Sequence, residues 1–143
     1  MRTIDEVGVK EAVPFFGVRD LARSLAFYEK GLGFRVVARW EPDGRLRWCR
    51  IEAGGAALML QEFAAASAPG SPTGLGVSVC FQCADALALH QLALERGLGP
   101  KEPFVGNGMW VVAFTDPDGY RIDFESVTNV PEDTTLSEWK ASR

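Results

Sequence analysis

Short runs of alternating apolar and polar residues fill most of the chain, and one helical pattern interrupts each half. In the first half Asp20 is a good helix N-cap, and leucine and aromatic residues at helical spacing follow it. Gly31 and Gly33 favour a left-handed end to that helix. Tight turns are expected at residues 42–44 and 54–55. The predicted order is strand, helix and three strands, over residues 11–18, 20–33, 34–40, 46–53 and 56–63.

The second half repeats this order. Residues 48–60 align with residues 110–124, because each segment runs from a Trp through a Gly-centred turn into an alternating strand. This alignment places Met59 opposite Asp123 and makes Trp48 and Trp110 equivalent. The predicted elements are a strand over 75–83, a helix over 84–96 closed by Gly97, and strands over 102–105, 109–115 and 120–126.

The duplication divides the chain into five segments. Both modules have the order βαβββ, which predicts an α+β fold, and the segment between them is rich in Pro, Gly and small residues. That segment is long enough to let the modules pair within one chain or between two. The predicted segments are an N-terminal arm (1–10), mobile or pairing at a sheet edge, a first module (11–63), a linker (64–74), a second module (75–126) and a tail (127–143) with a short helix after Thr134 or Thr135.

Composition limits the possible partners. The chain has 143 residues, 47% hydrophobic and 24% charged, with a net charge of -4, which is typical of one soluble globular domain. It has no cluster of basic residues, so nucleic acid is not an expected partner. Its apolar runs are too short for a membrane span. Asp5 and Glu6 stand where a signal peptide would be apolar, so a cytoplasmic location is expected.

The duplicated pattern resembles the vicinal oxygen chelate superfamily, which contains glyoxalase I, extradiol dioxygenases, fosfomycin resistance enzymes and bleomycin resistance proteins. The resemblance covers roughly residues 11–126 and implies one such domain. It also implies that each module's strands curl into half a cup, with helices on the outer face and ligand or metal on the concave face. The residues that carry the resemblance are Val18-Arg19-Asp20-Leu21, Ser24, Phe27-Tyr28, Gly31-Leu32-Gly33-Phe34 and the run Ala113 to Phe124.

Metal-binding members of that superfamily place one ligand on each of four inward strand positions. Carried onto this chain, the positions are Val13, Met59, Ser78 and Asp123, of which only Asp123 is a good ligand for a hard metal. The single histidine, His90, falls in an apolar helical stripe on the other side of the sheet. The sequence therefore predicts no bound metal, no cofactor and no catalytic residue.

Two other features allow catalysis but do not require it. Cys80 and Cys83 form a lone C-x-x-C motif, but residues three apart in a strand point to opposite faces, so buried structural cysteines are the preferred interpretation. Asp123 in an apolar cup could act as a general base. It could equally be a lining residue paired with Arg121 or Arg50.

Aromatic residues on or beside the strands point to a flat ligand, which they would bind by stacking and burial of area. By their repeat position, Trp48 and Trp110 are expected to face one another across the cup. The predicted ligand-binding residues are Phe15, Trp48, Arg50, Met59, Gln61, Ser78, Trp110 and Asp123.

The resemblance is strongest to the members without metal, such as bleomycin and mitomycin resistance proteins. It implies a metal-free small-molecule binding protein that sequesters an aromatic or cationic antibiotic, and a homodimer with cups at its interface. One alternative is a metal-dependent lyase, isomerase or dioxygenase-like enzyme, with Asp123 joined by Gln61, Glu62 or Glu125. Another is a regulatory or structural module whose cup is collapsed around its own side chains.

Overall fold

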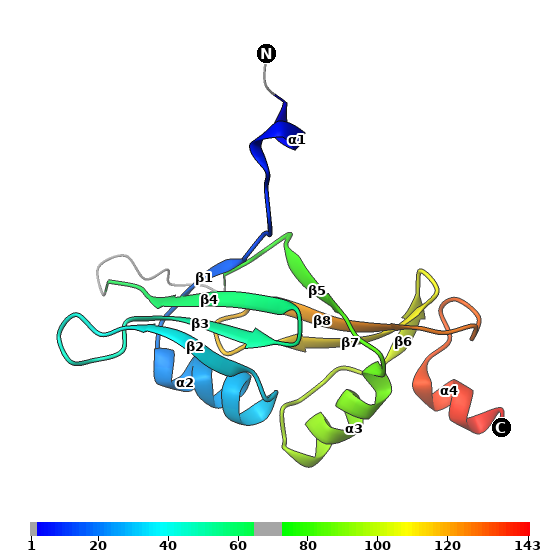
Figure 1. The fold of residues 1–143 in the computed structure, drawn as a ribbon. Helices are drawn as coiled ribbons and strands as arrows, with labels where there is room; N and C mark the ends of the chain where they lie inside the picture. The colour runs from blue at the N-terminus through cyan, green and yellow to red at the C-terminus, as the bar shows by residue number, and fades with distance from the viewer. Residues whose placement is uncertain (1–2, 65–72) are drawn as a thin grey trace.

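A computed structural model describes residues 3–64 and 73–143, so most of the predicted linker lies outside the described residues. It contains two four-stranded sheets with strand orders β1-β4-β3-β2 and β5-β8-β7-β6 (Figure 1). The predicted α+β fold with two βαβββ modules is confirmed. The elements are α1 (Ile4–Val7), β1 (Phe15–Val18), α2 (Leu21–Leu25), the π-helical η1 (Ala26–Gly31), β2 (Arg35–Trp40), β3 (Trp48–Ala53), β4 (Ala56–Glu62), β5 (Ser78–Gln82), α3 (Ala86–Glu95), β6 (Phe104–Gly106), β7 (Met109–Thr115), β8 (Arg121–Val127) and α4 (Leu136–Ala141).

The helix of the first module begins and ends for separate reasons. Asp20 caps it, since its carboxylate accepts a hydrogen bond from the Arg23 N–H at 3.1 Å. Gly33 has φ 88° and supplies the left-handed turn that follows the helix. Gly31 is not left-handed, contrary to expectation. It is buried, and a Cβ on it would lie 2.8 Å from Cδ2 of Leu98, so any larger residue there would have to displace the Leu98 side chain of the second module.

Two strands begin later than the hydrophobic pattern predicts. β1 starts at Phe15, directly after Pro14, which has no N–H for a sheet hydrogen bond. β5 starts at Ser78, and the preceding Leu75 is 90% exposed. Gly76 has φ 78°, which breaks the extended conformation between them. Apolar residues in these segments therefore extended the predicted strands beyond the true sheet.

Both ends of the chain form short helices. The predicted tail helix is present as α4, and Thr135 caps it by accepting a hydrogen bond from the Glu138 N–H at 3.2 Å. The arm contains α1, which the sequence pattern did not predict. No residue of α1 is buried, and Figure 1 shows it standing away from the sheets, on the side opposite α2 and α3.

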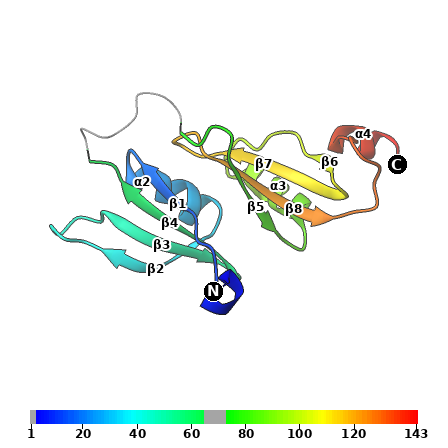
Figure 2. The same cartoon turned by 90° about the horizontal axis from the view of Figure 1, so that it is seen from above.

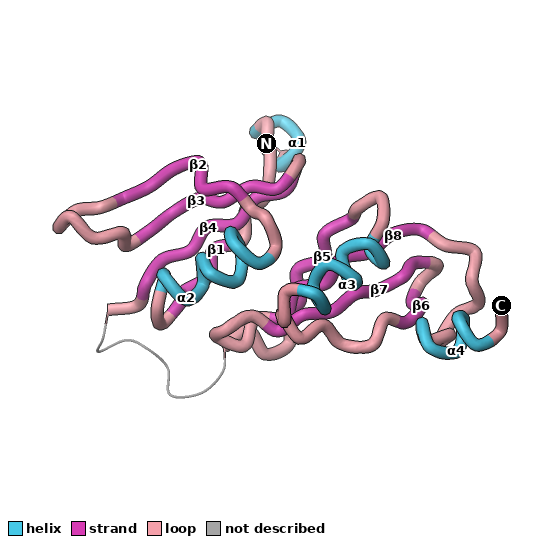
Figure 3. Tube along the Cα trace, turned by 90° about the horizontal axis from the view of Figure 1, so that it is seen from below, coloured by secondary structure: helices cyan, strands magenta, loops and turns pink. Residues whose placement is uncertain are grey.

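The two modules lie side by side within one chain (Figures 2 and 3). The rings of Phe16 and Tyr120 stack with centroids 4.1 Å apart, and the Tyr120 hydroxyl donates to the Gly17 carbonyl at 2.9 Å. Beside them, Arg19 and Asp118 form an ion pair at 3.0 Å. Because these contacts join the modules along their inner edges, α2 and α3 cover the same side of the two sheets.

A buried hydrogen bond also crosses the junction. Tyr28 is fully buried, and its hydroxyl donates to Oδ2 of Asp116 at 2.8 Å. Oδ1 of Asp116 accepts the N–H groups of Asp118 and Tyr120, each at 2.9 Å. Burial raises the pKa of the Asp116 carboxyl and, together with the nearby Asp116, raises the pKa of Tyr28 far above its ordinary value. Tyr28 therefore remains a hydrogen-bond donor at physiological pH.

The hairpins of the two modules differ in loop length, and this difference decides which side chains share a face. Residues 54–55 connect β3 to β4, whereas residues 116–120 connect β7 to β8. The second loop is longer by an odd number of residues, and a one-residue slip in a strand turns every side chain to the other face. Val111, rather than Trp110, therefore occupies the position equivalent to Trp48.

Trp110 accordingly lies on the helix-covered face. It is 5% exposed, and its ring contacts Trp139 of α4 with centroids 5.5 Å apart. Trp48 is half-buried and pairs across the sheet with Trp40. The expectation that Trp48 and Trp110 face one another is therefore wrong, and the cause is the unequal loops.

Replacing Asp116 with Asn should remove a gain in stability that this site gives wild type as the pH falls. The native pKa of Asp116 lies above the ordinary value of 3.8, so the charged form is disfavoured in the fold. Wild type therefore regains stability at this site as the pH falls from the raised value towards 3.8, and Asp116→Asn lacks that gain. Urea unfolding across this pH range measures the difference.

Tyr28→Phe provides a control that should widen, rather than remove, the pH window in which protonation of Asp116 stabilises the fold. It removes the hydrogen bond that holds the Asp116 pKa down, so the window should extend to higher pH, with a loss of about 1–3 kcal/mol at neutral pH. Equal pH slopes in wild type and Asp116→Asn would contradict this account of the junction.

The two tryptophans should respond differently to truncation. Trp110→Ala removes a buried ring and should lower the free energy of unfolding by about 3–5 kcal/mol. Trp48→Ala, on the uncovered face, should cost only about 1 kcal/mol. Chemical denaturation of both variants tests the face assignment, and similar losses would show that it is wrong.

Candidate functional site

The candidate site is the face of the two sheets that points away from α2 and α3, named here the open face. Cross-strand pairing assigns its residues, because directly paired residues share a face. The register pairs Trp48 with Gln61 and Arg50 with Met59, and the parallel β1–β4 pair adds Phe15 beside Met59. On the first sheet the open face comprises Phe15, Gly17, Arg35, Ala38, Trp40, Trp48, Arg50, Glu52, Ala57, Met59 and Gln61; on the second it includes Ser78, Cys80, Gln82, Val111, Ala113, Thr115, Arg121, Asp123 and Glu125, of which Val111, Ala113 and Asp123 are buried.

Seven of the eight predicted ligand-binding residues lie on the open face, and Trp110 does not. The seven residues on the open face form two groups, one on each sheet. Phe15, Trp48, Arg50, Met59 and Gln61 are cross-strand or diagonal neighbours on the first sheet, whereas Ser78 and Asp123 lie on adjacent strands of the second.

Aromatic surface is concentrated on the first group. Phe15 is 54% exposed and Trp40 is 50% exposed, and Trp48 is the direct partner of Trp40. Exposed aromatic rings of this size are costly in water and are typical of binding surfaces. The sequence pattern puts Trp40 at the end of the predicted strand 34–40 but does not mark it as a site residue. The hairpin turn at residues 42–44 could have paired it with Trp48.

A cavity of about 580 Å³ lies at the end of the first sheet beside these rings, and it is named here the sheet-end cavity. Its volume falls within the range of ligand pockets, about 300–1,000 Å³. Aromatic and charged side chains both line it. The lining residues are Trp40, Pro42, Arg45, Arg47, Gln61, Glu62, Phe63 and Ala64.

Arg50 is the central charged residue of the open face. Its guanidinium contacts Glu11 at 3.0 Å and Glu52 at 2.9 Å. Hydrogen bonds to Glu11 and Glu52 raise the pKa of Arg50. One cation shared by two carboxylates leaves a net negative group, which favours a cationic ligand. Glu11 was predicted at the start of the first strand but lies before β1, and the strand pattern did not mark it as the partner of Arg50.

The open face does not present a metal-binding set. Val13, Met59 and Ser78 offer no strong ligand, and the Asp123 carboxylate accepts a hydrogen bond from Nε of Arg121 at 3.2 Å. Within residues 3–64 and 73–143, no group of three His, Cys, Asp or Glu side chains is arranged to hold a metal ion. The donor chemistry therefore does not fit the two-His-and-carboxylate sites of metal-dependent relatives. His90 lies in α3, on the far side of the sheet, and burial lowers its pKa.

The cysteines differ from the expectation of buried structural residues. Cys80 and Cys83 are exposed, whereas Cys49 is buried, and all three are free thiols. The reason is that β5 is an edge strand, so its surroundings are more open than those of a central strand. Burial raises the pKa of Cys80 and Cys83 above the ordinary value and that of Cys49 to about 11. None of the three is an activated thiolate.

No helix in the described part of the chain is long and apolar enough to cross a bilayer.

Solved structures with the same fold include antibiotic-binding proteins. TnmS3, an antibiotic binding protein from Streptomyces sp. CB03234, is 26% identical with a TM-score of 0.63, over 83% of this chain and 98% of that one. A bleomycin resistance determinant encoded on the transposon Tn5 is 25% identical with a TM-score of 0.65, over 83% and 98%. TioX from Micromonospora sp. ML1, at 17% identity and TM-score 0.66 over 84% and 100%, shares the fold.

No curated protein sequence matches the chain. The family model described as the Glyoxalase/Bleomycin resistance protein/Dioxygenase superfamily matches residues 7–124, which covers both modules. The chain therefore belongs to the glyoxalase/bleomycin resistance protein/dioxygenase superfamily.

Proposed function

We propose that this protein binds a flat, aromatic, cationic small molecule on its open face and catalyses no reaction on it. The observation that carries the proposal is the Trp48–Trp40 pair, with Phe15 exposed two strands away on the same face, beside the Glu11–Arg50–Glu52 group. The rings offer stacking area, and the excess carboxylate offers attraction to positive charge. At the four positions where metal-dependent relatives hold their ion, only Asp123 is a strong ligand.

An antibiotic is the ligand class that we propose. TnmS3 is described as an antibiotic binding protein, and the Tn5 protein as a bleomycin resistance determinant. At 26% and 25% identity, these relatives support sequestration as the role. We also propose a cytoplasmic location, which agrees with three free cysteines in the structure.

We further propose a homodimer in which a second copy covers the open face. Both covering helices lie on the opposite side of the sheets, so the side chains of the open face meet no second layer from them (Figure 1). Phe15 and Val127 remain 54% and 87% exposed. A flat ligand is bound best when apolar surface covers both of its faces, and a second copy would supply the other wall.

Tryptophan fluorescence should report binding. Titration with flat cationic quinone and bleomycin-type glycopeptide antibiotics should quench the emission saturably. Trp48→Leu and Glu52→Gln should each weaken binding about tenfold or more, because one removes a stacking surface and the other removes the excess negative charge. Trp139→Phe, in α4 on the helix side, is the matched control and should retain the affinity.

Two results would overturn the proposed function. If no antibiotic quenches the emission, the interpretation as a regulatory or structural module gains support. If elemental analysis of purified protein finds a divalent ion at one equivalent per chain, a metal-dependent enzyme becomes the better interpretation.

The dimer can be tested separately. Light scattering should give twice the chain mass of 15.6 kDa. Phe15→Glu should lower that mass to the monomer value, since it places a charge on the covered face. Val37→Glu, equally apolar but on the bulge of β2, tests whether any exposed apolar position has the same effect. A monomeric wild type that binds ligand would refute the dimer alone.

A further inference from the structure

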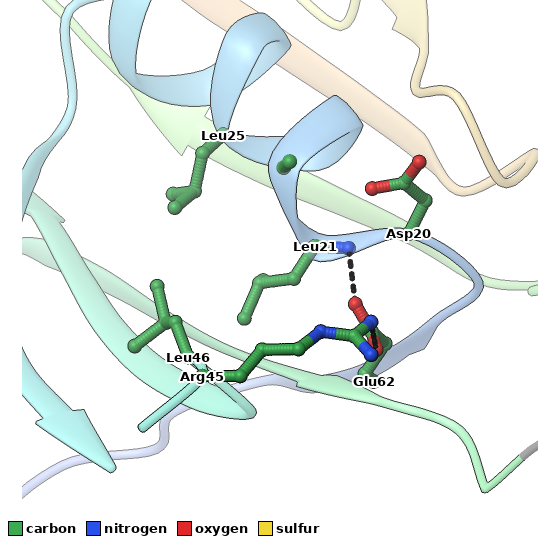
Figure 4. Close-up of a pocket in the computed structure, with 7 residues that line it drawn as sticks. Asp20, Leu21, Leu25, Arg45, Leu46 and Glu62 are labelled. Atoms are coloured by element: carbon green, nitrogen blue, oxygen red, sulfur yellow. Dashed lines mark hydrogen bonds and ion pairs between the residues drawn. The ribbon is translucent and has the colours of Figure 1, made fainter. Parts of the chain in front are cut away.

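A second cavity lies on the helix side of the first sheet, between the start of α2 and the segment before β3. Its volume is about 220 Å³, and it is named here the leucine cavity. Figure 4 shows the side chains of Leu21, Leu25 and Leu46 converging on it. It is separate from the open face, because Leu21 and Leu25 belong to the covering helix. The full lining is Asp20, Leu21, Ala22, Leu25, Arg45, Leu46 and Glu62.

One ion pair separates the leucine cavity from the sheet-end cavity. The two cavities share two lining residues, Arg45 and Glu62, and these side chains are bonded to each other. Leucine side chains lie on one side of the pair, and Trp40 and Phe63 lie on the other. The Arg45–Glu62 pair therefore forms the partition between an aliphatic and an aromatic space.

Glu62 is more buried than Arg45 and has more hydrogen-bond partners. The Glu62 side chain is only 7% exposed, and its carboxylate also accepts from the Leu21 N–H at 2.9 Å and from Arg47 at 3.3 Å. The Arg45 side chain is 60% exposed, and Glu62 is its ion-pair partner among the described residues. Among the described residues, Nη2 is the atom through which Arg45 bonds Glu62, so the Nε and Nη1 donors of the exposed guanidinium can bind a ligand while the ion pair stays in place.

These contacts also define the charge of a suitable ligand. Glu62 is already bonded to Leu21 and Arg47, so it has little capacity left for a cation. The Asp20 carboxylate caps α2 and points away from the leucines in Figure 4. Arg45 is thus the charged lining group with hydrogen-bond donors left for a ligand, and those donors favour a negative head group.

We propose that the leucine cavity binds a short-chain amphipathic carboxylate. The alkyl tail lies among Leu21, Leu25 and Leu46, and the carboxylate accepts hydrogen bonds from Nε and Nη1 of Arg45, beside the retained Arg45–Glu62 pair. The cavity of about 220 Å³ limits the tail to about seven heavy atoms, taking about 30 Å³ for each, as for a water molecule. This site is distinct from the open face, and its test measures binding of an alkyl carboxylate, so its failure leaves the proposed function standing.

Methyl NMR of the full chain tests the proposal with hexanoate as the probe. Hexanoate should shift the methyl resonances of Leu21, Leu25 and Leu46 saturably. Hexyltrimethylammonium, with the same tail and the opposite charge, should leave them unchanged. Equal binding of both ions, or shifts confined to the open face, would overturn the proposal.

Two variants locate the site. Ala22→Leu fills the cavity from an exposed helix position, and Arg45→Gln removes the charge; each should weaken hexanoate binding about tenfold or more. Arg39→Gln is the matched control, since Arg39 is 56% exposed and paired with Glu41, and it should retain wild-type affinity. Unchanged affinity in both cavity variants refutes the site. Thermal unfolding of each variant confirms that its fold is intact.

Discussion

The junction between the modules depends on the buried hydrogen bond from Tyr28 to Asp116. Asp116 also orders its own turn through the N–H groups of Asp118 and Tyr120, and Tyr120 in turn stacks on Phe16 of the first module. A carboxylate this buried is stable only when its oxygens are all bonded. Asp116 thus ties η1 of the first module to the β7–β8 loop of the second.

Because the junction fixes the modules, strand register decides what the open face presents. The five-residue loop between β7 and β8 places Val111 where the first module has Trp48. The second sheet therefore exposes polar groups such as Thr115, with Val111 and Ala113 buried on the same face, while the first offers aromatic rings. The two modules have the same topology, yet they provide unlike surfaces, as is useful when one ligand contacts both.

The sequence predicts the order of elements because hydrophobic periodicity and caps such as Asp20 are local signals. The short hairpin at residues 54–55 fixes the register that puts Trp48, Arg50, Met59 and Gln61 on one face, whereas Phe15 joins them through the parallel pairing of β1 with β4. The predicted face of Trp110 is wrong. Aligning the two repeats does not show that their hairpin loops differ by an odd number of residues, which turns the side chain to the other face. Contacts between segments distant in sequence, such as Glu11 with Arg50, have no local pattern at all.

Neighbouring residues of one strand serve different sites, and β4 shows why. Gln61 points to the open face, whereas Glu62, the next residue, points to the helix side and bonds the Leu21 N–H. Alternation along a strand therefore places the end of the open face and the wall of the leucine cavity one residue apart. Arg45 contacts Glu62 and lines both cavities, so a ligand that moves Arg45 in one cavity changes the wall of the other. Occupancy of the two cavities would then be coupled, and the coupling would be reciprocal because it is a single free energy.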